Sequence, residues 1–122
     1  MAPRNVREYI SARLGVETET RASAATATLG VAAAQLLPNA PRRIGFTFVN
    51  LSLNDAHILC GWTPTAGRNI LVEANGGWRA FLAEEFGEAV AWEWLAYADG
   101  AASAYLCLET LIALPARGPA RS

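Results

Sequence analysis

The sequence offers few side chains that could perform catalysis, and the first of them is its single histidine. His57 lies three residues before Cys60, and the other cysteine is Cys107. A histidine activates a thiol only where the two side chains meet, and positions 57 and 60 of one strand point to opposite faces of a sheet. We therefore interpret His57 as a residue at a strand edge and both cysteines as buried free thiols. No catalytic residue is predicted.

The next candidates for chemistry are the carboxylates Glu84, Glu85 and Glu88, which gather in one short segment. Paired carboxylates at set separations hydrolyse glycosides, and carboxylates also bind hard cations. The segment has no EF-hand spacing, and the cysteines fit no zinc spacing. We predict a solvated acidic loop over 84–90, no bound metal and no cofactor.

Four tryptophans are candidates for a binding surface. Trp92 and Trp94 are two residues apart, so within one strand they would share a face. Aromatic platforms of this kind bind sugars, and tryptophan is also enriched in protein interfaces. Core filling with a subunit interface predicts that most of the tryptophans are buried, whereas a sugar platform predicts that Trp78 or Trp92 is exposed in a groove. The candidate residues are Trp62, Trp78, Trp92 and Trp94.

Composition excludes several classes of function. The 122 residues suffice for one domain, and 52% of them are hydrophobic, enough for a packed core. Ten basic against eleven acidic residues give a net charge of −1, which excludes binding of nucleic acid through bulk charge. No apolar run approaches the roughly 18 residues of a membrane helix, and the N-terminus lacks a signal-peptide pattern. We expect a protein made in the cytoplasm, with neither a membrane nor a nucleic-acid partner.

Residues 3–15 are predicted to form a short amphipathic helix that ends at Gly15. A helix of this length is unstable alone in water, so its apolar stripe must lie either on its own domain or on a partner. Residues 16–28 are small and polar and are read as a linker or extended arm. The predicted partner-binding residues of this region are the apolar Val6, Tyr9, Ile10 and Leu14, with Arg7 and Arg13 elsewhere on the helix.

From residue 29 the pattern becomes that of β-structure. Asn75-Gly76 predicts a tight hairpin between two of the strands, and Arg42 and Arg43 are expected to be solvated or to bind a neighbouring subunit. Turn signals every eight to twelve residues predict an all-β fold, an antiparallel β-sandwich or small barrel of about seven strands. The predicted strands are 29–37, 43–50, 57–62, 70–73, 78–83, 92–98 and 102–114.

These elements define three regions of the chain. Residues 1–28 are the N-terminal helix and arm, which bind a partner. Residues 29–114 are the β-sandwich domain. Residues 115–122 are a flexible C-terminal tail rich in proline and glycine.

Three stretches within residues 27–112 carry a resemblance to a known family. They are LGVAAAQLLPNAPRRIGFTFVNLSLNDAHILCGW from residue 29, NILVEANGGWRAF from residue 69 and YADGAASAYL from residue 97. Their order of strands and turns resembles that of small structural proteins of tailed-bacteriophage virions, of the capsid decoration or cement type. The N-terminus, which is more helical and carries arginines, and the number of tryptophans depart from that pattern.

The resemblance implies a non-enzymatic β-sandwich that binds and stabilises a coat-protein shell. Its partner would be the major capsid protein or another virion protein, with an N-terminal arm gripping the shell. The resemblance also implies a homo-oligomer, most commonly a trimer, at the virion surface after synthesis in the host cytoplasm. The alternative is a carbohydrate-binding module or tail-tip adhesin that uses exposed tryptophans.

Overall fold

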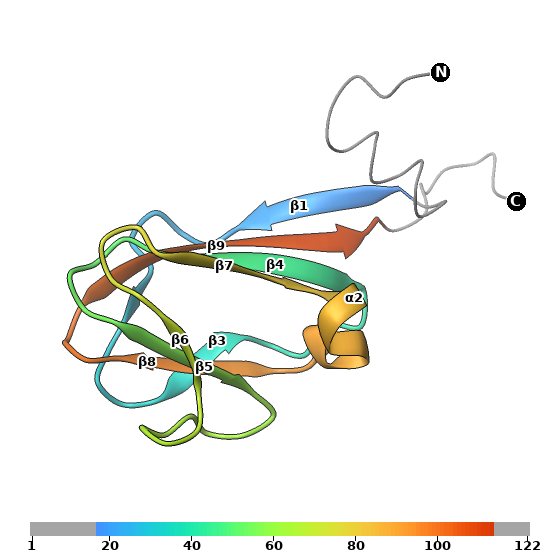
Figure 1. Ribbon diagram of the computed structural model, residues 1–122. Coiled ribbons are helices and arrows are strands. Elements are labelled where there is room, and N and C mark those ends of the chain that lie inside the picture. The colour runs from blue at the N-terminus through green and yellow to red at the C-terminus, as the bar shows by residue number, and fades with distance from the viewer. Residues whose placement is uncertain (1–16, 114–122) are drawn as a thin grey trace, which may run out of the picture.

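The strands of the computed structural model, which describes residues 17–113, form two antiparallel sheets that lie face to face (Figure 1). The predicted all-β sandwich is therefore confirmed. Within the described residues there are nine strands: β1 Thr18–Ala22, β2 Thr28–Leu29, β3 Ala34–Leu37, β4 Arg43–Asn50, β5 Ala56–Cys60, β6 Ile70–Val72, β7 Trp78–Leu82, β8 Trp94–Ala98 and β9 Ser103–Ile112. Two short helical segments, α2 Ala83–Phe86 and the 3-10 helix η1 Gly87–Ala91, follow β7.

The strand order identifies the type of sandwich. The first sheet has the order β1-β9-β4-β7 and the second sheet β3-β8-β5-β6. β2 also pairs with β9, next to β1, so that β1 and β2 are two parts of one interrupted strand. From β2 onward only the β5–β6 connection joins neighbours within one sheet, and every other connection crosses between the sheets. Eight strand positions in two sheets with this crossing pattern form a jelly roll.

The core between the sheets is aromatic. Phe46 and Phe48 alternate along β4 and are buried, as the sequence pattern predicts. Phe46 stacks on Phe81 with ring centroids 4.6 Å apart, and Trp94 of the second sheet meets Phe46 edge-on at 4.9 Å. Such contacts add about 0.5–1.5 kcal/mol each beyond the burial of apolar area. These rings fix the distance between the two sheets.

Arg43 is buried, which corrects the expectation that it is solvated or binds a neighbouring subunit. Its side chain is 0% exposed, and its Nε donates to Glu109 Oε2 at 2.7 Å. Its terminal nitrogens donate to the carbonyls of Trp92 at 3.0 Å and Pro38 at 2.7 Å. A buried charge persists only when it is paired and hydrogen-bonded. Arg43 therefore ties the first sheet to the segments that lead into the second.

The Asn75-Gly76 turn has the predicted backbone but joins different partners. Both residues have a positive φ, 61° and 90°. The strands on either side do not pair with each other, because β6 pairs with β5 and β7 pairs with β4. The predicted hairpin is wrong in its pairing, since local turn chemistry does not decide which sheet each strand joins.

Two further segments differ from the sequence prediction. Residues 84–90, predicted as a loop, form α2 and η1, which close one end of the sandwich. Residues 18–22, predicted as part of the arm, form β1 and pair with β9 along its whole length. The sandwich thus begins at Thr18 rather than at residue 29. The predicted helix over 3–15 and the tail at 115–122 lie outside the described residues.

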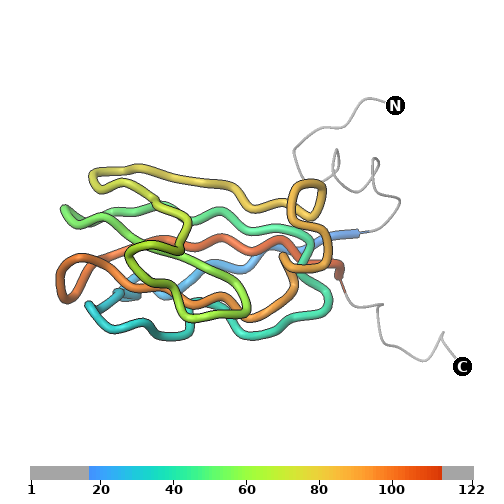
Figure 2. The backbone as a smooth tube through the Cα atoms, turned by 60° about the horizontal axis from the view of Figure 1, so that its bottom comes forward, coloured from blue at the N-terminus to red at the C-terminus, as the bar shows by residue number. Residues whose placement is uncertain are grey.

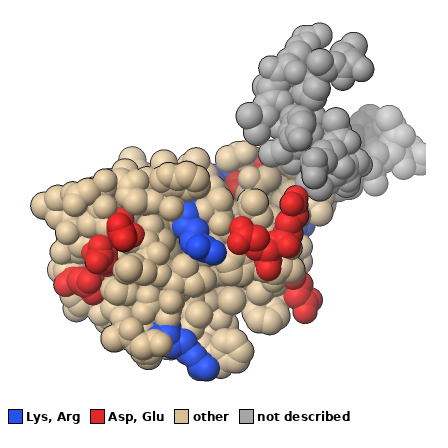
Figure 3. Space-filling view, in the orientation of Figure 1, with Lys and Arg blue, Asp and Glu red and all other residues tan. Residues whose placement is uncertain are grey.

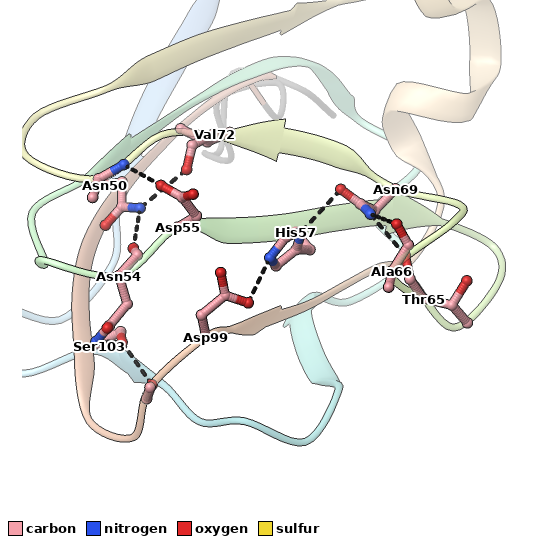
Figure 4. Close-up of polar contacts among 12 residues, drawn as sticks. Asn50, Asn54, Asp55, His57, Thr65, Ala66, Asn69, Val72, Asp99 and Ser103 are labelled. Atoms are coloured by element: carbon pink, nitrogen blue, oxygen red, sulfur yellow. Dashed lines mark hydrogen bonds and ion pairs between the residues drawn. The ribbon is translucent and has the colours of Figure 1, made fainter.

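At the opposite end, a buried asparagine organises the loops (Figure 4). Asn50 is 1% exposed, and its Nδ2 donates to the carbonyls of Asn54 at 2.7 Å and Val72 at 3.1 Å. Its Oδ1 accepts hydrogen bonds from the backbone N–H and the hydroxyl of Ser52. Asn54 in turn donates to the Ser103 hydroxyl at 3.1 Å. This network holds the β4–β5 loop against β6 and β9.

Candidate functional site

The strand register defines which side chains of the first sheet point away from the core. Residues directly opposite each other in an antiparallel pair share a face. Because Phe46 and Phe48 point inward, their neighbours on β4 and the partners of those neighbours point outward. This set is the first-sheet outer face: Thr18, Thr20, Ala22, Thr28, Gly45, Thr47, Val49, Trp78, Ala80, Leu82, Ala104, Leu106, Leu108, Thr110 and Ile112.

The first-sheet outer face carries no charged residue. Antiparallel sheets commonly present a polar, solvated outer face. Here the side chains are aliphatic, aromatic, threonine or glycine, and Trp78 is 68% exposed. No other described layer lies over this face in either backbone view (Figures 1 and 2). Depletion of charge with retention of large apolar groups is the composition of an interface core.

The charged residues of β1 point the other way. Glu19 lies opposite Leu111, and Arg21 lies opposite Glu109, both on the inward side of the sheet. Arg42 donates to Glu19 at 3.2 Å, and Arg21 lies 3.9 Å from Glu109. These ion pairs line the open edge of the sandwich and leave the first-sheet outer face uncharged.

The outer face of the second sheet has a different chemistry, centred on His57 (Figure 4). Nε2 of His57 lies 2.8 Å from Asp99 Oδ1, and Nδ1 lies 3.1 Å from Asn69 Oδ1. The amide nitrogen of Asn69 donates to the Thr65 carbonyl at 2.7 Å, which fixes its oxygen toward the histidine. Both ring nitrogens therefore face oxygen atoms, one of a carboxylate and one of an amide. The ring also stacks on Tyr97 at 4.5 Å.

His57 is thus a structural residue, although not at a strand edge. β5 lies between β6 and β8, which corrects the predicted edge position. His57 anchors the β5–β6 loop through Asn69 and the end of β8 through Asp99. Sequence reasoning missed both partners, which lie 12 and 42 positions along the chain.

The two thiols are free, as predicted. Cys60 pairs in register with the buried Trp94 and so faces inward, away from the outward His57. Burial, with the nearby Glu109 carboxylate, raises the pKa of Cys107 to about 12. Burial also raises the pKa of Cys60. Since the thiolate is the nucleophile, neither cysteine is activated.

The acidic residues of α2 are exposed, and they lie at the end of the sandwich that α2 and η1 close (Figure 3). Glu85 lies 3.8 Å from Arg79, a surface ion pair. Within residues 17–113, no three His, Cys, Asp or Glu side chains are grouped to hold a metal ion. In the same range no helix is long and apolar enough to cross a membrane.

The tryptophans divide into one core residue and three surface residues. Trp94 is 0% exposed, whereas Trp62, Trp78 and Trp92 are 63%, 68% and 39% exposed. The expectation that most are buried is therefore wrong. Trp92 and Trp94 also do not form one platform, because β8 begins at Trp94 and Trp92 lies before it. A Cβ at Gly61 would lie 3.6 Å from the Trp92 ring, so that this glycine lies against the indole.

The predicted arm residues lie outside the described part of the chain. They are Val6, Arg7, Tyr9, Ile10, Arg13 and Leu14. The structure thus replaces one predicted surface, the tryptophan pair, with another, the first-sheet outer face. That face was missed because its members come from five strands and share no local motif.

Comparisons with known proteins add a likeness of fold. No protein family matches the sequence, and no curated protein matches it. Two solved structures of the coat protein of Tobacco streak virus are similar. The C2 crystal form has a TM-score of 0.42 at 11% identity, and the coat protein dimer has a TM-score of 0.45 at 12% identity. Each match covers 84% of this chain and 88% of that chain.

Proposed function

We propose that this chain is a non-enzymatic structural protein of a virion, a decoration or cement protein that binds the coat-protein shell at the virion surface. The jelly roll is used by viral capsid proteins, lectins and cupins. A fold alone does not choose between such uses, so the choice rests on side chains. An enzyme needs convergent polar groups that are available to substrate. Those around His57 and Asn50 are engaged in structural hydrogen bonds.

The observation that carries the proposal is the uncharged first-sheet outer face. A sugar site needs hydrogen-bonding groups that fix orientation, whereas a protein interface needs a desolvated, charge-free centre. This face has the second composition, with Trp78 as its largest exposed side chain. The virion assignment itself comes from the resemblance of residues 27–112 to phage decoration proteins.

The mechanism is the summation of modest contacts on a symmetric lattice. Each residue that becomes ordered on binding costs about 1–2 kcal/mol of backbone entropy. Apolar burial offsets this at about 25 cal/mol per Å². Because the shell presents many identical sites in fixed positions, small gains per copy add up to resistance against internal pressure. The major capsid protein is the proposed partner.

Co-sedimentation of the purified protein with empty capsids of the source virus tests the proposal. Full-length protein is compared with a variant lacking residues 1–16, which retains every described strand because β1 begins at Thr18. Binding by the full chain supports a decoration role. Loss of binding in the deletion variant would place the contact in the N-terminal segment, and equal binding would place it on the sandwich. The proposal fails if the full chain stays in the supernatant.

A second candidate, carbohydrate binding, is favoured by the surroundings of Trp92. The exposed Trp62 follows Gly61, whose N–H donates to the Glu93 carbonyl at 3.0 Å. Gln35 donates to the Glu93 carboxylate at 2.6 Å. Exposed indoles beside polar side chains are the elements of a sugar platform. A glycan array with wild type and Trp92→Ala tests it: sugar binding that is lost in the variant would support this candidate.

A further inference from the structure

The first sheet ends at a strand that has a neighbour on one side only. Within residues 17–113, β7 is the last strand in the order β1-β9-β4-β7 and pairs with β4 alone. In yellow, β7 forms the upper border of the described chain in Figure 2, with no described segment beyond it. An edge strand presents a row of free N–H and C=O groups that can template pairing with another strand. The backbone chemistry of this edge therefore fits a second β-strand.

The hydrogen-bond phase of the β4–β7 ladder identifies the free groups. Asn50 accepts a backbone hydrogen bond from Gly76 at 2.7 Å and donates one to Gly77 at 2.8 Å. Hydrogen-bonded pairs alternate along an antiparallel ladder, and the register from this point is continuous. Arg79 and Phe81 consequently bond to β4. The residues whose backbone N–H groups point away from β4 are the alternate ones: Trp78, Ala80 and Leu82.

The other edge strands of the sandwich carry features that oppose pairing. β1 has two charged residues among its five and is interrupted before β2. β3 has a register shift between Gln35 and Leu37 and is followed by Pro38. β6 has only three residues. Charge, bulges, proline and short length are the means by which natural sheets prevent association between edges.

β7 has little of this protection. Its sequence is WRAFL, without proline and in unbroken register with β4. Its single charged residue, Arg79, lies over the rings of Phe81 and Phe86, with the guanidinium carbon 5.5 and 5.9 Å from their centroids. Trp78 and Leu82 are 68% and 43% exposed. Aromatic and apolar residues suit a strand that is paired on both sides, so β7 is the edge that is open to pairing.

The side-chain pattern of β7 is complementary to itself about Ala80. Antiparallel pairing of two copies across a twofold axis at this residue uses all five residues and sets Ala80 against its own counterpart. Trp78 then lies opposite Leu82 of the other copy, and each covers an exposed apolar group. Arg79 lies opposite Phe81 of the other copy, so that a cation meets an aromatic ring. An axis at Arg79 would instead oppose two like charges, which is destabilising.

We propose that this chain forms a dimer in which β7 of one copy pairs antiparallel with β7 of a second copy about Ala80. The pairing uses both free edges, so it closes at two copies rather than at the trimer that the sequence resemblance implies. It joins the two first sheets into one continuous sheet and brings both Trp78 side chains to the middle of a joined, uncharged outer face. This goes beyond the proposed function, because it concerns association of the free protein.

A proline at residue 80 tests the pairing while leaving the β4–β7 ladder intact. An edge strand tolerates proline where the N–H would face solvent. Ala80→Pro removes an outward donor from the centre of the pairing and should weaken dimerisation of the full chain at least tenfold. Light scattering coupled to size exclusion, over a dilution series, measures this effect. Ala80→Thr keeps the N–H and is the matched control, which should remain dimeric. Thermal melts establish that each variant is folded.

Cross-linking provides the second measurement. Ala80→Cys treated with a short bis-maleimide should give a covalent dimer, because residues in a hydrogen-bonded antiparallel pair have Cα atoms about 5.5 Å apart. Thr20→Cys, exposed on the opposite edge strand, is the matched control and should give no more dimer than wild type, whose two free cysteines set the background.

Three outcomes would overturn the dimer. They are a full chain that is monomeric or trimeric, a dimer that persists undiminished in a folded Ala80→Pro variant, and cross-linking of Ala80→Cys no stronger than that of Thr20→Cys. Capsid co-sedimentation of the full chain is scored separately, so the failure of either proposal is recognised without the other.

Discussion

The outer faces of the two antiparallel sheets of this sandwich differ in the polar groups that they present. The second sheet presents His57 held between Asn69 and Asp99, beside Tyr97. The first sheet presents no charge at all. The polar groups of the second face are hydrogen-bonded within the fold, beside the outward-pointing Leu59, Leu71 and Leu95. The first-sheet outer face gains favourable free energy only when another surface covers its apolar side chains. Polar groups that are already hydrogen-bonded within the fold argue against an interface on the second face. Exposed apolar groups without charge argue for an interface on the first.

The largest loss of stability is expected from removing Arg43, which ties the first sheet to the segments that lead into the second. Arg43→Ala removes a buried guanidinium that donates to the Glu109 carboxylate and to three backbone carbonyls. Loss of one partner of a buried ion pair costs about 3–5 kcal/mol. Urea denaturation followed by tryptophan fluorescence measures it. Arg42→Ala, at a part-exposed ion pair, is the control and should cost under about 1 kcal/mol. Equal effects of the two changes would contradict the buried role of Arg43.

A smaller loss is expected at the loop end of the sandwich. Asn50→Ala leaves the carbonyls of Asn54 and Val72 without their side-chain donor. Unsatisfied buried groups cost about 1–3 kcal/mol. The free energy of unfolding should fall by that amount, while capsid binding should be unchanged because the first-sheet outer face is intact. Faster amide hydrogen exchange confined to residues 50–55 would support this prediction. Protection of these amides equal to that in wild type would contradict it.

His57→Phe sharpens the comparison between the faces directly. Phenylalanine keeps an aromatic ring over Tyr97 but loses both hydrogen bonds, which should cost about 1–2 kcal/mol. Trp78→Arg should show the reverse behaviour, with stability within about 0.5 kcal/mol of wild type and weakened co-sedimentation with capsids. Thermal melts and capsid co-sedimentation of both variants measure the two effects. The contrast between the faces fails if His57→Phe abolishes capsid binding and Trp78→Arg does not.

The smallest effect concerns the thiols. Because the pKa of Cys107 is about 12 in the folded protein and near 9 when unfolded, its contribution to stability is complete below pH 9. That contribution is lost as the pH rises from 9 toward about 12. At pH 8 a thiol reagent should label Cys107 only after unfolding, and Cys60 slowly. Rapid labelling of Cys107 in the native protein would contradict its burial.

The sequence predicted the elements better than their pairing. Alternation of Phe46 and Phe48 located β4, a central strand of the first sheet, and the turn residues located most strand ends. Pairing depends on backbone hydrogen bonds between distant segments, which is why the Asn75-Gly76 turn was assigned to a hairpin. β1 was missed because its charged residues lie on the inward side, at an open edge, and leave no apolar alternation.

The candidate surface was harder to predict than the fold. Its residues are ordinary threonines, alanines and leucines on five strands, and only the register brings them to one face. The tryptophans attracted attention by their type, but residue type does not distinguish the buried Trp94 from the exposed Trp78. The absence of charge from alternate positions of 43–50, 78–83 and 102–114 was a usable signal, though it acquires meaning only with the topology.

The pairing of β1 along β9 has a mechanical consequence. Five residues of β1 pair in register with β9, from Thr18 opposite Ile112 to Ala22 opposite Leu108. Interstrand hydrogen bonds lie perpendicular to the strands, so a pull along the N-terminal segment loads them together in shear rather than one after another. A tether attached in this way resists force far better than one that peels from an edge. The sandwich can therefore bear tension through its N-terminus while its loops and second sheet remain unloaded.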